Sequence, residues 1–97
     1  ELLVDEQNHT ITYRSNPIDF TNKQFELFVY LIKNHNRLVS RDELLNQIWG
    51  YDYIGETRTL DVHIKEIRRK LKLIGLHQPI IETVRSKGYR FIYEKKD

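Results

Sequence analysis

The sequence has no cysteine and no methionine among its 97 residues. Without cysteine, the chain has no disulfide framework, no thiolate zinc site and no cysteine nucleophile. It also lacks any apolar run near the ~18 residues that a membrane-spanning helix needs, and no signal-peptide segment opens the chain. We therefore expect no membrane association. The missing methionine predicts that the chain is a piece of a longer protein.

Glycine is scarce too, and the few residues that commonly carry catalysis are poorly arranged for it. The four glycines are scattered singly, so no glycine-rich loop is available to bind phosphate. The histidines, at His9, His35, His63 and His77, lack the H-x-x-x-H or H-E-x-x-H spacing of zinc sites. The sequence therefore predicts a protein that is not an enzyme and that holds no metal and no cofactor.

The length and the charge distribution are more informative. A chain of 97 residues is enough for one compact domain, so we expect residues 1–97 to form a single unit. Residues 1–57 contain five Lys or Arg and nine Asp or Glu, whereas residues 58–97 contain eleven and five. This asymmetry predicts one surface that faces a polyanion. Ordinary solvated charge is the alternative.

Strands are expected at both ends of the chain. Short apolar runs at 2–4, 10–13 and 18–20, separated by turn residues, are typical of an antiparallel meander. Residues 80–84 and 89–93 are expected to pair as a β-hairpin.

Three helices are expected between these strands. Thr21 with Gln24 and Ser40 with Glu43 form two capping boxes, which begin helices ending near residues 34–36 and at residue 50. A third and longer helix should run from about residue 57 to residue 74. The order of elements predicts an α+β fold in which the helices pack as one cluster.

The predicted third helix has an apolar stripe and a basic opposite face. The stripe consists of Leu60, Ile64, Ile67 and Leu71. The opposite face carries Arg58, Val62, Lys65, Glu66 and Arg69. Cations suit phosphates and guanine edges, and an exposed valine suits a thymine methyl group, so this face favours a helix that enters the DNA major groove. A solvated surface with one exposed valine is the alternative.

Two further segments bear on function. Arg85, Lys87 and Arg90 make the hairpin tip cationic, which suits a narrow minor groove, although such charges also protect an edge strand from pairing. Residues 50–57 form an aromatic connection longer than the 3–4 residues of a helix-turn-helix turn. We therefore expect this loop to have a task of its own.

An ordered series of motifs runs along almost the whole chain. It comprises Ser40-Arg41-Asp42-Glu43-Leu44-Leu45, Ile48-Trp49-Gly50, Arg58-Thr59-Leu60-Asp61-Val62-His63-Ile64, Arg68-Arg69-Lys70-Leu71, Ile81-Glu82-Thr83-Val84-Arg85 and Gly88-Tyr89-Arg90-Phe91. In this order and spacing, the series resembles the winged-helix effector domain of OmpR/PhoB-class two-component response regulators. The resemblance implies a winged helix-turn-helix with an N-terminal antiparallel sheet, a three-helix core and a C-terminal hairpin wing.

The resemblance also implies a function. Such a domain is the output part of a cytoplasmic transcription regulator in a phosphorelay, and its N-terminal receiver domain, absent from this chain, would be phosphorylated by a sensor histidine kinase. It would bind double-stranded DNA as a head-to-tail dimer on direct repeats, and its long loop would contact RNA polymerase.

Site residues follow from the same resemblance. Positions expected to face the phosphate backbone are Arg41, Trp49, Arg58, Thr59, His63, Lys65, Arg68, Thr83 and Tyr89. Positions expected to read bases are Val62, Glu66 and Arg69 in the major groove and Arg85 in the minor groove. The expected polymerase contact consists of Tyr51, Asp52, Tyr53 and Ile54.

The sequence departs from the family pattern at two positions. Glu66 stands where relatives often carry arginine; it can accept a hydrogen bond from cytosine N4, or it can form an ion pair with Arg69 or Lys70 and leave DNA alone. Ser86 replaces a glycine that is usual in the wing turn, and a side chain there restricts the backbone. This departure puts the expected role of Arg85 in doubt.

Several alternatives stay open at this point. Trp49 is expected in the core, with its indole N–H as an alternative phosphate contact. The loop aromatics either form an exposed protein-contact patch or fold back on the domain. RNA binding would need aromatics on an open sheet or a GXXG loop, which the pattern does not favour. A module that binds proteins through residues 50–57 is the main alternative function.

Overall fold

The computed structural model describes residues 2–93, and its N-terminal part is a small antiparallel sheet. Strands β1 (Leu2–Asp5), β2 (Thr10–Tyr13) and β3 (Asn16–Pro17) lie in the order β1-β2-β3. The meander is confirmed, but its third strand precedes the predicted run at 18–20. Arg14 and Ser15 have φ of 50° and 70°, which makes a tight two-residue turn and brings Asn16 opposite Tyr13.

The three helices form where the sequence predicted them, the first two from their capping residues and the third from its apolar periodicity. Helix α1 (Asn22–Lys33) begins at the Thr21 capping box, in which both reciprocal hydrogen bonds are present. Helix α3 (Arg58–Leu73) is the longest. Helix α2 (Arg41–Leu44) continues directly into a π-helical turn, η1 (Leu45–Trp49), which the sequence did not indicate. The second predicted capping box is only half formed: the Ser40 hydroxyl accepts from the Glu43 N–H, but the Glu43 carboxylate accepts from Tyr30 and Arg37 instead.

A second sheet joins the wing to the helices. Strands β5 (Ile81–Val84) and β6 (Gly88–Phe91) form the predicted hairpin, and β4 (Val39–Ser40) pairs with β6 to give the order β4-β6-β5. Gly88 lies against the β4 backbone so closely that a Cβ would overlap the Val39 carbonyl oxygen. Only glycine fits there, so the close pairing of β4 and β6 depends on it.

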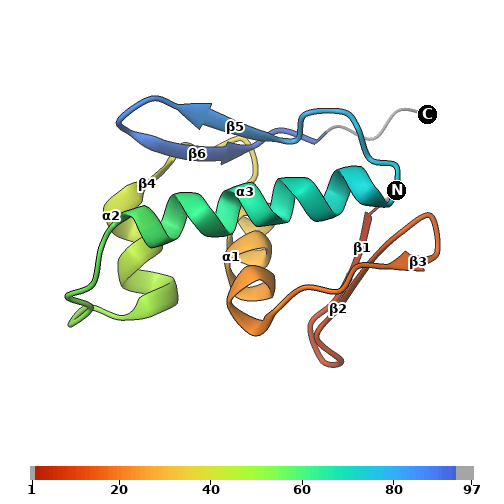
Figure 1. Ribbon diagram of the computed structural model, residues 1–97, viewed down its shortest axis with the longest axis horizontal. Coiled ribbons are helices and arrows are strands. Elements are labelled where there is room, and N and C mark those ends of the chain that lie inside the picture. Colours follow the sequence, from red (N-terminus) through yellow and green to blue (C-terminus); the bar gives the residue numbers. More distant parts are fainter. Residues whose placement is uncertain (1, 94–97) are drawn as a thin grey trace.

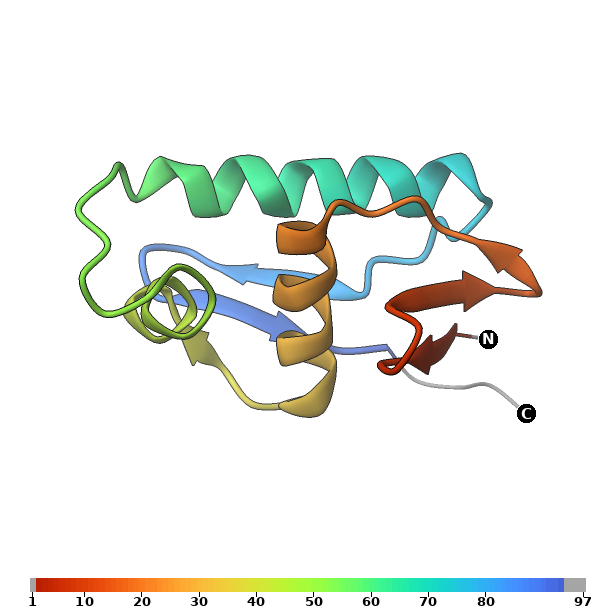
Figure 2. The same cartoon turned by 90° about the horizontal axis from the view of Figure 1, so that it is seen from below.

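The core lies between α3, α1 and the two sheets. The predicted stripe Leu60, Ile64, Ile67 and Leu71 is buried. In Figure 2, α3 runs along one side of the molecule, α1 descends from it, and the N-terminal sheet and the 50–57 loop lie at opposite ends. The hairpin of β5 and β6, here called the wing, lies alongside α3 (Figure 1). Among residues 2–93, no helix is long and apolar enough to cross a membrane.

Candidate nucleic-acid interface

The side of α3 that faces away from the core is basic and open. Val62 is 58% exposed in the middle of this side, and Arg58 and Lys65 beside it are also exposed. Within residues 2–93, the one ion pair of Arg58 is loose, with Nε 3.9 Å from an exposed Glu56 carboxylate. We call the exposed side chains of Arg58, Val62, Lys65 and Arg69, together with half-exposed Glu66, the outward face of α3.

Within the outward face, Glu66 and Arg69 form an ion pair. Arg69 Nη2 lies 2.8 Å and Nε 3.0 Å from Glu66 Oε1, and the hydrogen bond from Arg69 lowers the pKa of the Glu66 carboxyl below its ordinary value. The pairing expected as one alternative is thus formed in the free domain. Lys70 is turned away, donating to the Asp19 carbonyl at 2.6 Å and to Gln24 Oε1 at 2.7 Å.

His63 is oriented by its own helix and by Trp49. Its Nδ1 lies 2.8 Å from the Thr59 carbonyl oxygen, which can only accept, so Nδ1 carries the hydrogen and Nε2 is left for another partner. The Trp49 ring meets the His63 ring edge-to-face at 5.0 Å. Trp49 is half-buried against the core, as its predicted core role requires.

Arg68 ties α3 to the wing. Its Nη2 donates to the Ile81 carbonyl and to Thr83 Oγ1, both at 2.7 Å. The guanidinium also lies 5.9 Å from the centroid of the Tyr89 ring. Two predicted phosphate contacts, Arg68 and Thr83, are therefore brought together, and the first orients the second.

Arg41 and Tyr89, two other predicted phosphate contacts, already have partners inside the domain. Both bind Asp61: Arg41 donates to its two carboxylate oxygens at 2.6 and 3.0 Å, and the Tyr89 hydroxyl donates to Oδ1. Tyr89 is only 5% exposed, and burial, with the bond to Asp61, raises its pKa to about 12. These side chains do not project as free donors, contrary to the simple expectation.

Asp61 is the residue that the sequence reasoning missed. The hydrogen bond from Arg41 lowers the pKa of its carboxyl, so the ion pair persists at neutral pH. The available signal was an acidic residue in the first turn of an otherwise basic helix. Its partners, however, come from α2 and β6, and their approach depends on the folded chain.

The wing tip is exposed, and its backbone is constrained. Ser86 has φ of 66°, in the left-handed region that favours glycine, so the serine accepts the conformation at a steric cost. The turn is closed by a hydrogen bond from the Lys87 N–H to the Val84 carbonyl at 2.9 Å. Arg85 and Lys87 are exposed at the tip, whereas Arg90 is paired with Glu82 at 2.7 Å.

In the loop of residues 50–57, some side chains are exposed and one folds back on the domain. Tyr51 is 79% and Ile54 98% exposed, and Asp52 is exposed beside them. Tyr53 folds back: its hydroxyl donates to the Glu56 carbonyl at 3.1 Å, and its ring lies 6.2 Å from that of Trp49. The exposed apolar surface therefore comes from Tyr51 and Ile54.

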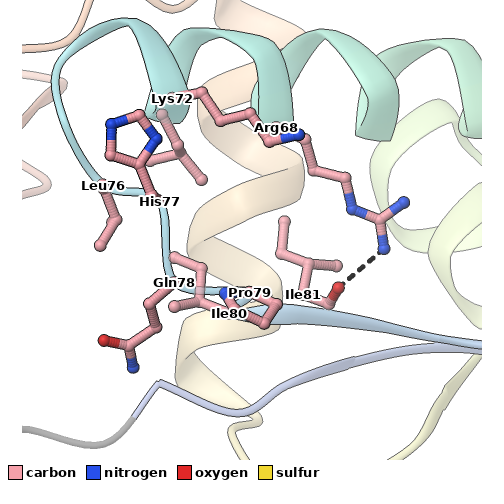
Figure 3. Close-up of a pocket in the computed structure, with 9 residues that line it drawn as sticks. Arg68, Lys72, Leu76, His77, Gln78, Pro79, Ile80 and Ile81 are labelled. Carbon is pink, nitrogen blue, oxygen red and sulfur yellow. Dashed lines mark hydrogen bonds between the residues drawn. The ribbon is translucent and has the colours of Figure 1, made fainter.

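A shallow cavity of about 390 Å³ lies between the second half of α3 and the start of β5. Leu71, Leu76, Ile80 and Ile81 form its apolar lining, with Arg68, Lys72 and His77 among its polar residues. In Figure 3, Arg68 reaches across to the Ile81 carbonyl.

Among residues 2–93, no cluster of three metal-binding side chains is present.

Comparisons with known proteins identify the family and the fold. Residues 15–91 match the family model described as "Transcriptional regulatory protein, C terminal". The sensory transduction protein RegX3 of Mycolicibacterium smegmatis is 37% identical over 87 residues, 90% of this chain and 38% of that protein. The transcriptional regulatory protein SrrA of Staphylococcus aureus is 33% identical over 97 residues, 99% of this chain and 40% of that protein. The chain thus spans less than half the length of these relatives.

Solved structures share the fold over nearly the whole chain. The DNA-binding domain of Bacillus subtilis CssR has a TM-score of 0.83 and 29% identity, covering 95% of this chain and 100% of that one. The Klebsiella pneumoniae RstA DNA-binding domain, solved in complex with the RstA box, has a TM-score of 0.81 and 30% identity, covering 94% and 90%. The chain therefore belongs to the C-terminal domain family of transcriptional regulatory proteins, the winged-helix effector domains of OmpR/PhoB-type response regulators.

Proposed function

We propose that this domain binds double-stranded DNA in a sequence-specific way, with α3 in the major groove and the wing tip at the adjacent minor groove. The observation that carries the proposal is the outward face of α3, where Val62 is exposed between Arg58 and Lys65. An apolar side chain among cations matches a groove lined by phosphates and thymine methyl groups. The RstA relative, of the same fold, was solved bound to its DNA box.

The residue roles follow from this placement. Arg58, Thr59, Lys65, Arg68 and Thr83 face phosphates, together with the indole of Trp49 and with His63, whose Nε2 donates to a phosphate oxygen in the cationic form of the ring. Val62, Glu66 and Arg69 face base edges, and Arg85 reaches the minor groove from the wing tip. Arg41 and Tyr89 support this surface through Asp61.

We also propose the wider setting that the family suggests. The domain is the output part of a longer, phosphorylation-controlled regulator, whose receiver domain takes its signal from a sensor histidine kinase. Two copies bind direct repeats head to tail, about one helical turn apart. Tyr51, Asp52, Tyr53 and Ile54 face RNA polymerase, with Tyr51 and Ile54 supplying the exposed apolar contact.

The experiment is selection from a random-duplex pool, followed by salt titration on the recovered site. We expect two direct repeats and, for about five to seven phosphate contacts per domain, a slope of log K against log[salt] of roughly −4.5 to −6. Lys65→Ala should reduce the slope by about 0.9. Lys33→Ala is the matched control. Lys33, at the end of α1, forms an ion pair with Glu6 at 2.8 Å, and its replacement should leave the slope unchanged. An unenriched pool at low salt would reject DNA binding.

A domain that only binds proteins is the second candidate, and the exposure of Tyr51 and Ile54 favours it. That function predicts no DNA affinity to titrate. The same selection therefore separates the two.

A further inference from the structure

The Asp61 carboxylate lies where three elements of the proposed DNA-binding surface meet. Arg41 opens α2, Asp61 is in the first turn of α3, and Tyr89 is on β6 of the wing. Arg41 Nη1 and Nη2 donate to the two carboxylate oxygens at 2.6 and 3.0 Å, and the Tyr89 hydroxyl donates to Oδ1. One side chain thus connects the α2 segment, α3 and the wing.

Both terminal nitrogens of Arg41 are engaged in hydrogen bonds within the domain. Besides the carboxylate, Arg41 Nη2 donates to the Thr57 carbonyl at 3.2 Å, so both terminal nitrogens of the guanidinium have protein partners. The side chain of Arg41 is 27% exposed and that of Asp61 44%. The pair carries no net charge at the edge of a surface that also holds the exposed cations Arg58 and Lys65.

The first turn of α3 is a place where an arginine would otherwise reach the DNA backbone. Asp61 lies one residue before Val62 and three after Arg58, both exposed on the outward face. Each arginine that reaches a phosphate releases counterions and strengthens binding to DNA of any sequence. A carboxylate that holds such an arginine weakens this sequence-independent binding.

We propose that Asp61 is a positioning residue that keeps Arg41 off the phosphate backbone. The domain then makes one fewer non-specific contact with DNA, and the wing is held in a fixed position relative to α3. This inference rests on the proposed DNA binding. It assigns to a carboxylate, not to a cation, control over how strongly the domain binds DNA without regard to sequence.

The test is Asp61→Asn, which keeps the shape and removes the charge. With Arg41 released, the slope of log K against log[salt] on a random duplex should steepen by about 0.9. The Asp61→Asn variant should bind this duplex more tightly than the wild type at low salt, and the ratio of the two affinities should fall roughly threefold as salt rises from ~50 to ~200 mM. In the double variant Asp61→Asn/Arg41→Gln, the slope should return to that of the wild type.

The matched control is Glu43→Gln. It also turns a carboxylate into an amide and releases an arginine, because Arg37 holds Glu43 at 2.7 and 3.1 Å. Arg37 follows the end of α1 that lies farthest from α3 in Figure 2, so this variant should keep the wild-type slope. An equal steepening in both variants would mean a bulk charge effect and would overturn the proposal.

The remaining outcomes also decide. An unchanged slope for Asp61→Asn, or a steeper slope that persists in the double variant, overturns the assignment to Arg41. If Asp61→Asn does not fold, the guanidinium NMR signals of wild-type Arg41 answer instead. They should hold their positions when DNA is added while those of Arg58 move, and movement of both would refute the proposal. Absence of any DNA binding by the wild type would reject the proposed function itself.

Discussion

The basic residues of α3 differ in what they can offer DNA, because each has a different neighbour. Arg68 is held by the wing at Ile81 and Thr83, and Lys70 by the segment that enters α1. Lys65 has no hydrogen-bonding or acidic partner among residues 2–93, so it is the cation most available to a phosphate. A count of positive charge overstates the contacts that this helix can make.

Glu66 is the residue whose replacement should change sequence preference. In Glu66→Ala, the acceptor that could meet cytosine N4 is removed and Arg69 is released from its 2.8 Å ion pair. We expect the selected sites to change at one base pair, by about 1–3 kcal/mol of discrimination. Sequencing of sites selected by both proteins measures it.

Glu56→Ala is the control for that prediction. It removes the same charge from an exposed position in the loop, 3.9 Å from Arg58, and should leave the selected sequence as it is. If Glu66→Ala selects the same sites as the wild type, Glu66 serves only its ion pair with Arg69.

At the scale of elements, the junction of α1 and α2 depends on Glu43. Its carboxylate accepts from the Tyr30 hydroxyl and from both terminal nitrogens of Arg37. These bonds, with that of Arg37 first, lower its pKa to about 2. A carboxyl group with a lowered pKa stabilises the fold when ionised, so this contribution is complete above the ordinary pKa of about 4.5 and is lost as the pH falls towards 2.

Replacing this carboxylate should therefore weaken the domain in a pH-dependent way. We expect Glu43→Gln to lower the free energy of unfolding by about 1–2 kcal/mol at pH 7, a value kept modest because the pair is partly exposed. The difference from the wild type should shrink between pH 4.5 and 2. Urea unfolding across that range measures both, and a difference that stays constant with pH would contradict the assignment.

Local patterns predicted the elements well where the chain itself carries the signal. The capping pair at Thr21 and Gln24 and the apolar stripe of α3 are both short-range features, and both formed as expected. The π-helical turn after α2 was missed, because Leu45–Trp49 reads as an ordinary helical segment and its widening shows only in the backbone.

The candidate site was predictable only in part. The exposure of Val62 follows from helical periodicity, and the structure agrees. The partners of Asp61 could not be predicted, since Arg41 and Tyr89 are 20 and 28 positions away. Whether a cation is free or paired is decided by such long-range contacts, which periodicity does not contain.

At the scale of the whole molecule, the loop tip and α3 offer separate surfaces. Tyr51 and Ile54 are exposed in the 50–57 loop, and this loop lies beyond the first turn of α3 (Figure 2). Because neither packs in the core, the double variant Tyr51→Ser/Ile54→Ser should leave the unfolding free energy and the DNA affinity within about 0.5 kcal/mol of the wild type. Transcription with RNA polymerase by the full-length regulator should fall. Weaker DNA binding in this variant would assign the tip to the DNA surface instead.

The pairing of β4 with β6 also affects how the domain folds. Val39 pairs with Tyr89 and Ser40 with Gly88, so the two-residue strand β4 pairs with residues about fifty positions later in the chain. Contacts so far apart in sequence form slowly, because a long loop must close first. During synthesis, β4 emerges well before β6, so the sheet of order β4-β6-β5 can form only after residues up to Phe91 have left the ribosome.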